Sequence, residues 1–160
     1  MTAIVAIAHG RRVTLAAESA ISQGAEHPLA YTSDPKVWVQ GREVIGVCGN
    51  ADADAIASTL DWSGDLRKAA GEFARATRRA EGGTSVLIGR RGKIYAYSGG
   101  AIWTVRESYA AIGSAEAYLL GVLDGWASRR KLAPGDARVA VRLACRRFGD
   151  CGGRLVSVSA

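Results

Sequence analysis

The chain has 160 residues, 48% of them hydrophobic and 22% charged, a composition typical of a folded domain that buries most of its apolar surface. Its longest apolar runs are interrupted by Glu, Arg or Gly, so none approaches the roughly 20 residues of a membrane-spanning helix. The net charge of +6 comes from short basic clusters without interleaved aromatic residues, which argues against nucleic acid as a partner. We therefore expect a single domain over residues 1–160, in the cytoplasm, with no membrane or nucleic acid partner.

The first half of the chain predicts two β-hairpins followed by two helices. Residues 3–8 and 12–18 are apolar and flank the turn HGRR, and residues 36–40 and 43–48 flank the turn QGRE. The segment NADADAIASTLDW begins with Asn50, a good helix N-cap, and DLRKAAGEFARATRRA places apolar side chains on one helical face.

The second half predicts three strands, two helices and a final strand. TSVLIGR, KIYAYS and AIWTVR are rich in β-branched and aromatic residues, and they belong either to a second sheet or to a continuation of the first. SAEAYLLGVLDGWASRRK and PGDARVAVRLACRRFG predict helices, with Ser114 as an N-cap and Pro134 near a helix start. GRLVSVSA closes the chain as a strand.

This order of elements predicts an α+β fold, specifically a four-layer α/β/β/α sandwich. Two sheets packed face to face, each covered by helices on its outer side, are buried on both faces. That arrangement explains why AIVAIA and VTLAA are nearly continuous apolar runs instead of strict alternations.

The cysteines and histidines do not predict a metal site or a cofactor. Cys48, Cys145 and Cys151 are odd in number, and their spacing fits neither a disulfide framework nor a metal-binding pair, which is typical of a reducing compartment. His9 and His27 are isolated in the sequence and are interpreted as turn or surface residues.

Five segments together resemble a known family over nearly the whole chain. Thr2 opens a strand, and LAAES, DPKVWV, VIGVCGN and YAAIGSAEAY follow in order. Their order and spacing resemble the proteasome β-type peptidases, and most of all the HslV-like peptidase subunits of bacterial ATP-dependent proteases. The resemblance implies an N-terminal nucleophile (Ntn) hydrolase, and so a proteasome-like sandwich.

The resemblance implies that Thr2 is the nucleophile and that its own α-amine is the base. A free α-amine has an unperturbed pKa near 8, whereas an amide nitrogen has no comparable basicity, so Met1 must be removed. A small second residue such as threonine fits removal by methionine aminopeptidase. Thr2 alone could also be merely a tolerated second residue.

Other residues match family positions one by one. Lys36 matches a lysine beside the nucleophile, and Glu18 stands where the family has an aspartate that orients this lysine. Replacing Glu18 by the family's shorter aspartate is therefore expected to be tolerated or to improve activity. Ser22 matches a position whose backbone pairs with the bound peptide, and Ser114 matches a serine near the N-terminal amine.

Two residues near the end of the fourth predicted strand keep two interpretations each. Gly49 matches a glycine whose N–H helps to form the oxyanion hole, although a glycine between strand and helix also provides backbone freedom. Val47 matches a residue that lines the pocket for the residue before the scissile bond, although a buried strand valine is the commoner explanation.

The chain departs from the family near its C-terminus. Where the family carries an acidic residue and then a serine before two glycines, this chain has Phe148 and Cys151. Either this helper pair is missing or Asp150 substitutes for it from a neighbouring position.

The leading hypothesis is a threonine peptidase that cleaves unfolded polypeptide inside a ring. The resemblance implies self-assembly into a double ring of six or seven subunits and an ATP-dependent unfoldase as partner. Two alternatives remain open: a catalytically silent scaffold subunit with the same fold, and an Ntn amidase that acts on a small molecule.

Overall fold

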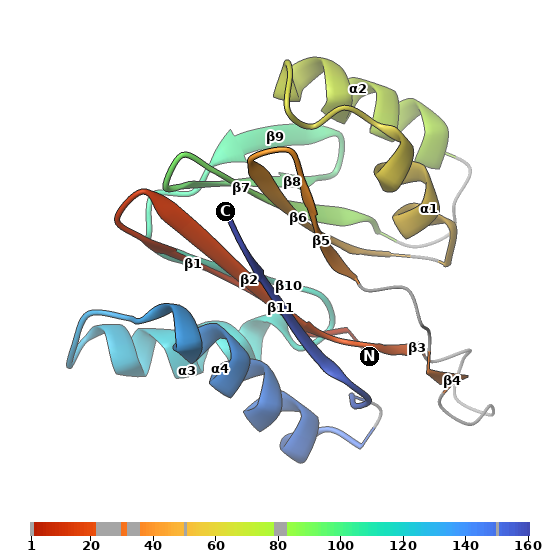
Figure 1. Cartoon of the computed structure of the whole chain (residues 1–160). Coiled ribbons are helices and arrows are strands. Elements are labelled where there is room, and N and C mark those ends of the chain that lie inside the picture. The colour runs from red at the N-terminus through yellow and green to blue at the C-terminus, as the bar shows by residue number, and fades with distance from the viewer. Residues whose placement is uncertain (1, 22–29, 32–35, 50, 79–82, 150) are drawn as a thin grey trace.

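Two antiparallel sheets form the centre of the computed structural model, which describes residues 2–21, 30–31, 36–49, 51–78, 83–149 and 151–160 (Figure 1). The first sheet has the order β10-β1-β2-β11. Its strands are β1 (Ile4–His9), β2 (Arg12–Glu18), β10 (Tyr109–Ile112) and β11 (Leu155–Ser159).

The second sheet has the order β5-β6-β7-β8-β9, so each strand pairs with its neighbour in sequence. Its strands are β5 (Val37–Gln40), β6 (Glu43–Cys48), β7 (Ser85–Arg90), β8 (Lys93–Ser98) and β9 (Ala101–Thr104). A short separate pair consists of β3 (Ala20–Ile21) and β4 (Ala30–Tyr31).

The helices come in two pairs, one on the outer face of each sheet (Figure 1). α1 (Ala51–Thr59) and α2 (Leu66–Thr77) cover the second sheet, and α3 (Glu116–Ala127) and α4 (Pro134–Arg147) cover the first. The Asp65 side chain caps α2 by accepting backbone N–H bonds, and α4 begins with proline at its first position, where the missing N–H costs nothing.

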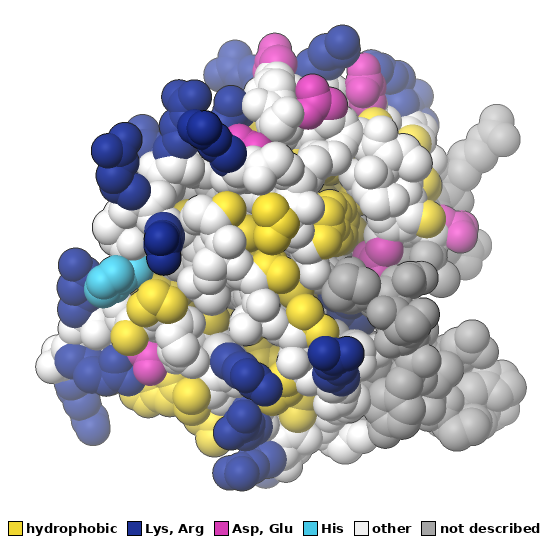
Figure 2. All heavy atoms as spheres, viewed as in Figure 1, with side chains coloured by type: hydrophobic (Ala, Val, Ile, Leu, Met, Phe, Trp, Pro, Cys, Tyr) yellow, Lys and Arg dark blue, Asp and Glu magenta, His cyan; other side chains and the backbone are white. Residues whose placement is uncertain are grey.

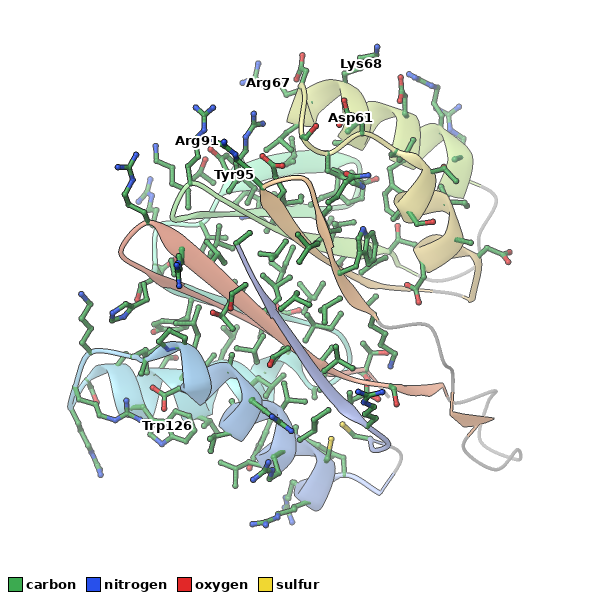
Figure 3. The ribbon with its side chains drawn as sticks, in the orientation of Figure 1. Asp61, Arg67, Lys68, Arg91, Tyr95 and Trp126 are labelled. Carbon is green, nitrogen blue, oxygen red and sulfur yellow. The ribbon has the colours of Figure 1, made fainter. Side chains whose placement is uncertain are left out.

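Three apolar cores separate the four layers, and apolar side chains fill the space between the two sheets (Figure 3). β1 shows why its sequence is a continuous apolar run. Ile4 and Ala6 face the second sheet, whereas Val5 and Ile7 face α3 and α4. At Gly89 on β7 the sheets approach so closely that a Cβ atom would lie 2.5 Å from Val13 Cβ.

The predicted four-layer α+β sandwich is confirmed, with differences in detail. The three central strands join β5 and β6 in one sheet, which resolves the alternative left open by the sequence. Residues 109–112 form a strand that was not predicted, because these four residues directly precede a helical pattern. The predicted N-cap at Ser114 is wrong, since Ala115 occupies that position, and Asn50 lies outside the described residues.

The surface carries its basic residues in several groups. Figure 2 shows Lys and Arg side chains gathered at separate places around one face, with apolar and uncharged surface between them. Within the described ranges, no helix is long and apolar enough to cross a bilayer.

Candidate active site

The backbone of Thr2 is held by the turn between β10 and α3. Ala115 N–H donates to the Thr2 carbonyl oxygen at 3.2 Å. Gly113, with φ of +102°, packs so closely that an added Cβ atom would lie 2.3 Å from the same oxygen. Only a glycine fits this conformation and this approach, so the turn fixes where the start of β1 lies.

A buried ion pair lies beside the Thr2 side chain. Lys36 Nζ donates to Glu18 Oε1 at 2.6 Å and to Thr2 Oγ1 at 3.3 Å. Lys36 is 5% exposed and Glu18 is 1% exposed, so both charges are removed from water. A buried ion pair is tolerated only when its remaining hydrogen-bonding capacity is also used, and Ala3 N–H donates to the same Glu18 oxygen at 3.2 Å.

Three strands bring these groups together at one end of the sandwich. Thr2 precedes β1, Glu18 ends β2, and Lys36 precedes β5. β1 and β2 pair antiparallel with Ile4 opposite Ala17, which places the end of β2 next to the beginning of β1. The Lys36 side chain reaches this point from the opposite sheet.

Ser114 completes the contacts of Thr2. The Thr2 backbone N–H donates to Ser114 Oγ at 2.9 Å. While Met1 is attached, this nitrogen is an amide, and removal of Met1 would convert it into an amine at the same place. The sequence-predicted residues Thr2, Glu18, Lys36 and Ser114 therefore form one connected cluster, which we call the Thr2 cluster.

Gly49 and Val47 lie near the Lys36 side of this cluster, but Val47 is buried and Gly49 is exposed. Val47 N–H donates to the Lys36 carbonyl at 3.0 Å, so the end of β6 runs beside the start of β5. The Val47 side chain is 0% exposed and packs in the core beneath α1 and α2. Gly49 is exposed, two residues further on, and an added Cβ atom would lie 2.7 Å from Thr84 Cγ2.

The C-terminal departure from the family has a structural counterpart. Phe148 caps the end of α4, and its ring lies edge-on to Tyr118 at a centroid distance of 5.4 Å. Cys151 is 3% exposed, and its Sγ lies 3.1 Å from Cys145 Sγ. Ser22 and Asp150 lie outside the described residues.

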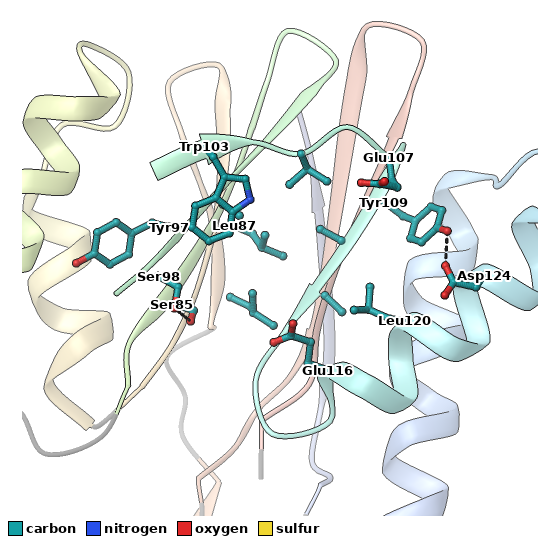
Figure 4. Close-up of a pocket in the computed structure, with 15 residues that line it drawn as sticks. Ser85, Leu87, Tyr97, Ser98, Trp103, Glu107, Tyr109, Glu116, Leu120 and Asp124 are labelled. Atoms are coloured by element: carbon teal, nitrogen blue, oxygen red, sulfur yellow. Dashed lines mark hydrogen bonds between the residues drawn. The ribbon is translucent and has the colours of Figure 1, made fainter. Parts of the chain in front are cut away.

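A separate pocket of about 520 Å³ opens between the two sheets at their β9 and β10 edges (Figure 4). Its wall combines the aromatic residues Tyr97, Trp103 and Tyr109 with the carboxylates of Glu107 and Glu116. Asp124, also in the lining, accepts a hydrogen bond from the Tyr109 hydroxyl, which raises the pKa of Tyr109 to about 12. Thr2, Glu18 and Lys36 are not among the lining residues, so this pocket is distinct from the Thr2 cluster.

The Thr2 cluster has the groups that an activated hydroxyl requires. An ammonium group that donates to a hydroxyl oxygen favours the deprotonated form of that hydroxyl. The buried Glu18 carboxylate holds the ammonium in place, and Ser114 holds the Thr2 nitrogen. In the described part of the chain, no three His, Cys, Asp or Glu side chains gather closely enough to hold a metal ion.

Sequence reasoning missed two features of the site. Gly113 was not singled out, although the glycine in AAIGSA, between an apolar run and a helix, is a signal for a constrained turn. The proximity of Cys145 and Cys151 was also missed, because a spacing of six residues has no meaning until the end of α4 is known.

Comparison with solved structures identifies the fold. Eukaryotic HslV from Trypanosoma brucei matches with a TM-score of 0.78 and 19% identity, covering 99% of this chain and 98% of that chain. Thiobacillus denitrificans BPH in complex with epoxomicin matches with a TM-score of 0.81 and 16% identity, at the same coverages. Anbu from Yersinia bercovieri matches with a TM-score of 0.76 and 16% identity, covering 99% of this chain and 82% of that one.

No protein-family model matches the sequence, and no curated protein matches it. The structural matches nevertheless define the class: this chain has the fold of the proteasome-like Ntn hydrolases. Within that class its structure is HslV-like over almost its full length, as the sequence resemblance predicted.

Proposed function

We propose that the protein is a threonine peptidase in which Thr2, once Met1 has been removed, is the N-terminal nucleophile. The observation that carries this proposal is the buried contact from Lys36 Nζ to both Thr2 Oγ1 and Glu18 Oε1. A structural ion pair requires only the contact between Lys36 and Glu18. The additional contact from Lys36 Nζ to Thr2 Oγ1 is what an activated hydroxyl requires.

In the proposed reaction, Thr2 Oγ1 attacks the carbonyl carbon of a peptide bond while its proton passes to the Thr2 α-amine. The peptide C–N bond then breaks, and the leaving amine takes that proton. The resulting ester on Thr2 is hydrolysed by water, with the same amine as base. Lys36 stabilises negative charge on Oγ1, Glu18 orients Lys36, and Ser114 orients the amine.

Stabilisation of the oxyanion is assigned to the N–H of Gly49. Its exposed place at the end of β6 leaves its backbone accessible, and the strand end is fixed by the bond from Val47 to Lys36. Donors of this kind contribute about 3 kcal/mol to transition-state stabilisation. Ser22 and Val47 remain proposed substrate-binding positions, although the buried Val47 side chain would act through the packing beneath it.

The proposal includes a ring and a cytoplasmic location. We propose that this chain forms a double ring of six or seven subunits, in which an ATP-dependent unfoldase supplies unfolded polypeptide. The HslV-like fold supports self-assembly. Light scattering after size exclusion, over a range of concentrations, measures the assembly. A monomer throughout that range would contradict a self-compartmentalised peptidase and favour the small-molecule amidase.

The deciding experiment combines mass spectrometry with a variant. The intact mass of protein from its native host should correspond to a chain that begins at Thr2. This processed protein should hydrolyse short fluorogenic peptides, and Thr2→Ala should abolish hydrolysis without changing the melting temperature. Thr2→Ser, which keeps a hydroxyl, is the matched control and should retain activity.

Two outcomes would contradict the proposed threonine peptidase: quantitative retention of Met1, or full activity in Thr2→Ala. Retained Met1 in a protein that still forms a ring would support the alternative of a silent scaffold subunit. The specific observation that favours this alternative is Phe148, which packs against Tyr118 where the family resemblance implies an acidic residue.

Epoxomicin offers a second probe, because it is bound in the BPH structure. A ligand that binds only the folded protein raises its melting temperature. We expect epoxomicin to raise the melting temperature of the processed protein and to leave that of Thr2→Ala unchanged.

A further inference from the structure

Two cysteines that the proposed reaction does not use lie side by side beneath the Thr2 cluster. Cys145 is in the last turn of α4, and Cys151 lies in the segment that connects α4 to β11. Their Sγ atoms are 3.1 Å apart. A disulfide requires a sulfur separation near 2.05 Å, so closing the bond needs an approach of about 1 Å.

The local backbone already brings the two residues together. After α4 ends, Cys151 N–H donates to the Phe148 carbonyl at 3.1 Å, which folds the chain back towards the helix. Both sulfur atoms are thiols in this structure. Disulfide formation would therefore stabilise a turn that exists in the reduced protein.

The two thiols differ in the way that a reactive and a resolving cysteine differ. Cys145 is partly exposed, whereas Cys151 is 3% exposed. The hydrogen bond between the two side chains lowers the pKa of Cys145 and, together with burial, raises the pKa of Cys151. Cys145 is thus the thiol that an oxidant can reach and that ionises more readily.

Cys48 provides a contrast within the same chain. It is buried between the two sheets, in a different core from Cys145 and Cys151. Burial raises the pKa of Cys48 to about 11. A thiol that is both buried and protonated is a poor nucleophile, so Cys48 should be inert under conditions that oxidise Cys145.

We propose that Cys145 and Cys151 form an oxidation site that hydroperoxides convert reversibly into an intramolecular disulfide. The Cys145 thiolate attacks one oxygen of the peroxide, an S–O bond forms, the O–O bond breaks, and hydroxide leaves, or an alkoxide when the peroxide is an organic hydroperoxide. The Cys151 sulfur then attacks the Cys145 sulfur, the S–O bond breaks, and the oxygen leaves as water with the Cys151 proton. Two electrons pass from the two thiols to the peroxide, and a dithiol reductant reverses the change.

The position of the pair connects this chemistry to the Thr2 cluster. Cys151 packs in the same core as Ala3, the residue whose N–H binds Glu18. The segment after Cys151 leads into β11. Just before this strand, Arg154 N–H donates to Ser19 Oγ at 2.9 Å, and the first residue of the strand, Leu155, lies opposite Glu18. A shift of Cys151 towards α4 would therefore be transmitted to the strand end that carries Glu18.

The test uses the full chain and needs no peptidase activity. Reduced protein is treated with hydrogen peroxide, denatured and alkylated with N-ethylmaleimide, and its intact mass is measured by mass spectrometry. We expect one alkylated cysteine instead of three, a loss of two hydrogen atoms, and a crosslinked Cys145–Cys151 peptide in a non-reducing digest. Dithiothreitol should restore three alkylated cysteines.

Single serine variants assign the roles. Cys48→Ser should form the disulfide as wild type does, and Cys145→Ser should not react. Cys151→Ser should accumulate a sulfenic acid on Cys145 that dimedone traps, and Cys145 should react at least about tenfold faster than Cys48. Three alkylatable cysteines after peroxide treatment, or a disulfide between two chains instead of within one, would overturn the proposal.

A second measurement addresses the consequence for the site, and this part rests on the proposed peptidase. Protein that is active when reduced is compared before and after oxidation. Small misplacements of reacting groups lower rates strongly, so we expect at least about a tenfold loss that dithiothreitol reverses. Cys145→Ser should keep its rate under the same treatment. An unchanged rate of peptide hydrolysis in disulfide-bonded protein would refute the effect of the disulfide on the Thr2 cluster. The disulfide itself is tested separately, by the mass measurement.

Discussion

The Thr2 cluster and the pocket beside Trp103 are two polar regions that hold their charges in opposite ways. In the cluster, Lys36 and Glu18 are buried and bound to each other at 2.6 Å. In the pocket, Glu107 and Glu116 are exposed around an open space of about 520 Å³ (Figure 4). The carboxylates of the open pocket therefore interact more weakly with other charges than the buried pair does, because water screens them.

This difference distinguishes a region whose charges have fixed partners from one whose charges are exposed to water. Burying two charges is unfavourable unless each is bound by fixed partners, and the cluster supplies them from β1, β2 and the start of β5. In this molecule the buried pair also contacts a hydroxyl oxygen, since Lys36 Nζ lies 3.3 Å from Thr2 Oγ1, so the cluster is the stronger candidate for a reactive site. If this is right, substitutions of the two buried charges, Lys36 and Glu18, should affect both stability and activity, whereas substitutions in the pocket should affect neither strongly.

The largest effect is expected from Lys36→Ala. It leaves Glu18 buried without this ammonium, which costs about 3–5 kcal/mol, and it removes the group that donates to Thr2 Oγ1. Chemical denaturation and peptide hydrolysis measure the two losses. Lys68→Ala, an exposed lysine on α2, is the matched control and should change neither.

A double variant separates stability from chemistry at this position. Lys36→Met with Glu18→Leu replaces both charges by apolar groups of similar volume, which should recover much of the lost stability. Activity should remain absent. Recovery of activity together with stability would mean that Lys36 has only a structural role.

The next largest effect is expected from Gly113→Ala. A side chain at positive φ costs about 1 kcal/mol, and here the new Cβ atom would also displace the Thr2 carbonyl, 2.3 Å away. We expect a loss of stability above about 2 kcal/mol and strongly reduced hydrolysis. Gly10→Ala, at φ of +63° with no atom within 4 Å of its Cβ, isolates the backbone term and should leave activity intact.

Gly113 also illustrates what the sequence could and could not predict. Helical periodicity was sufficient for both helix pairs, and short apolar runs bounded by turn residues were sufficient for most strands. The four residues of β10 were not predicted, since they directly precede the helical pattern of α3. Its pairing with β1 is what brings the Gly113 turn to Thr2.

The residues of the Thr2 cluster were predicted from a family resemblance, because local sequence patterns do not indicate that they lie together. Thr2, Glu18, Lys36 and Ser114 are far apart in the sequence. Pairing of β1 with β2 and β10 brings Thr2, Glu18 and Ser114 together, and packing of the second sheet on the first brings Lys36 to them. The Cys145–Cys151 contact had no such guide, because it depends on how the chain turns after α4. Both the Thr2 cluster and the Cys145–Cys151 contact depend on tertiary packing, which local sequence patterns do not predict.

A smaller effect is expected from Glu18→Asp. Glu18 Oε1 binds Lys36 Nζ and Ala3 N at 2.6 Å and 3.2 Å, and an aspartate, shorter by about one 1.5 Å bond, cannot keep both without movement of β2. The sequence predicted that aspartate would be tolerated, and the geometry now predicts a partial loss of activity and about 1–2 kcal/mol of stability.

Glu18→Gln keeps the length but removes the charge, and it provides the comparison for this prediction. If length limits the site, Glu18→Asp should be impaired in proportion to the lost contacts, and crystals of the variant should show a longer distance from residue 18 to Lys36 Nζ. Full activity in Glu18→Asp would show that β2 adjusts freely, and it would agree with the expectation from the family resemblance.

The smallest effect is expected in the pocket, at the hydrogen bond from Tyr109 to Asp124. This bond, and secondarily burial, raises the pKa of Tyr109 to about 12 from 10. Because the folded-state pKa is higher than the unfolded one, the stabilisation is complete below pH 10 and is lost as the pH rises towards 12. Tyr109→Phe should therefore lower stability by about 0.5 kcal/mol at neutral pH, and the difference from wild type should shrink above pH 10. Melting temperatures of both proteins from pH 7 to 11 measure this difference. Peptide hydrolysis should be unaffected at pH 7, because neither residue lies in the Thr2 cluster, and a large loss of activity in Tyr109→Phe would show that the pocket and the cluster act as one site.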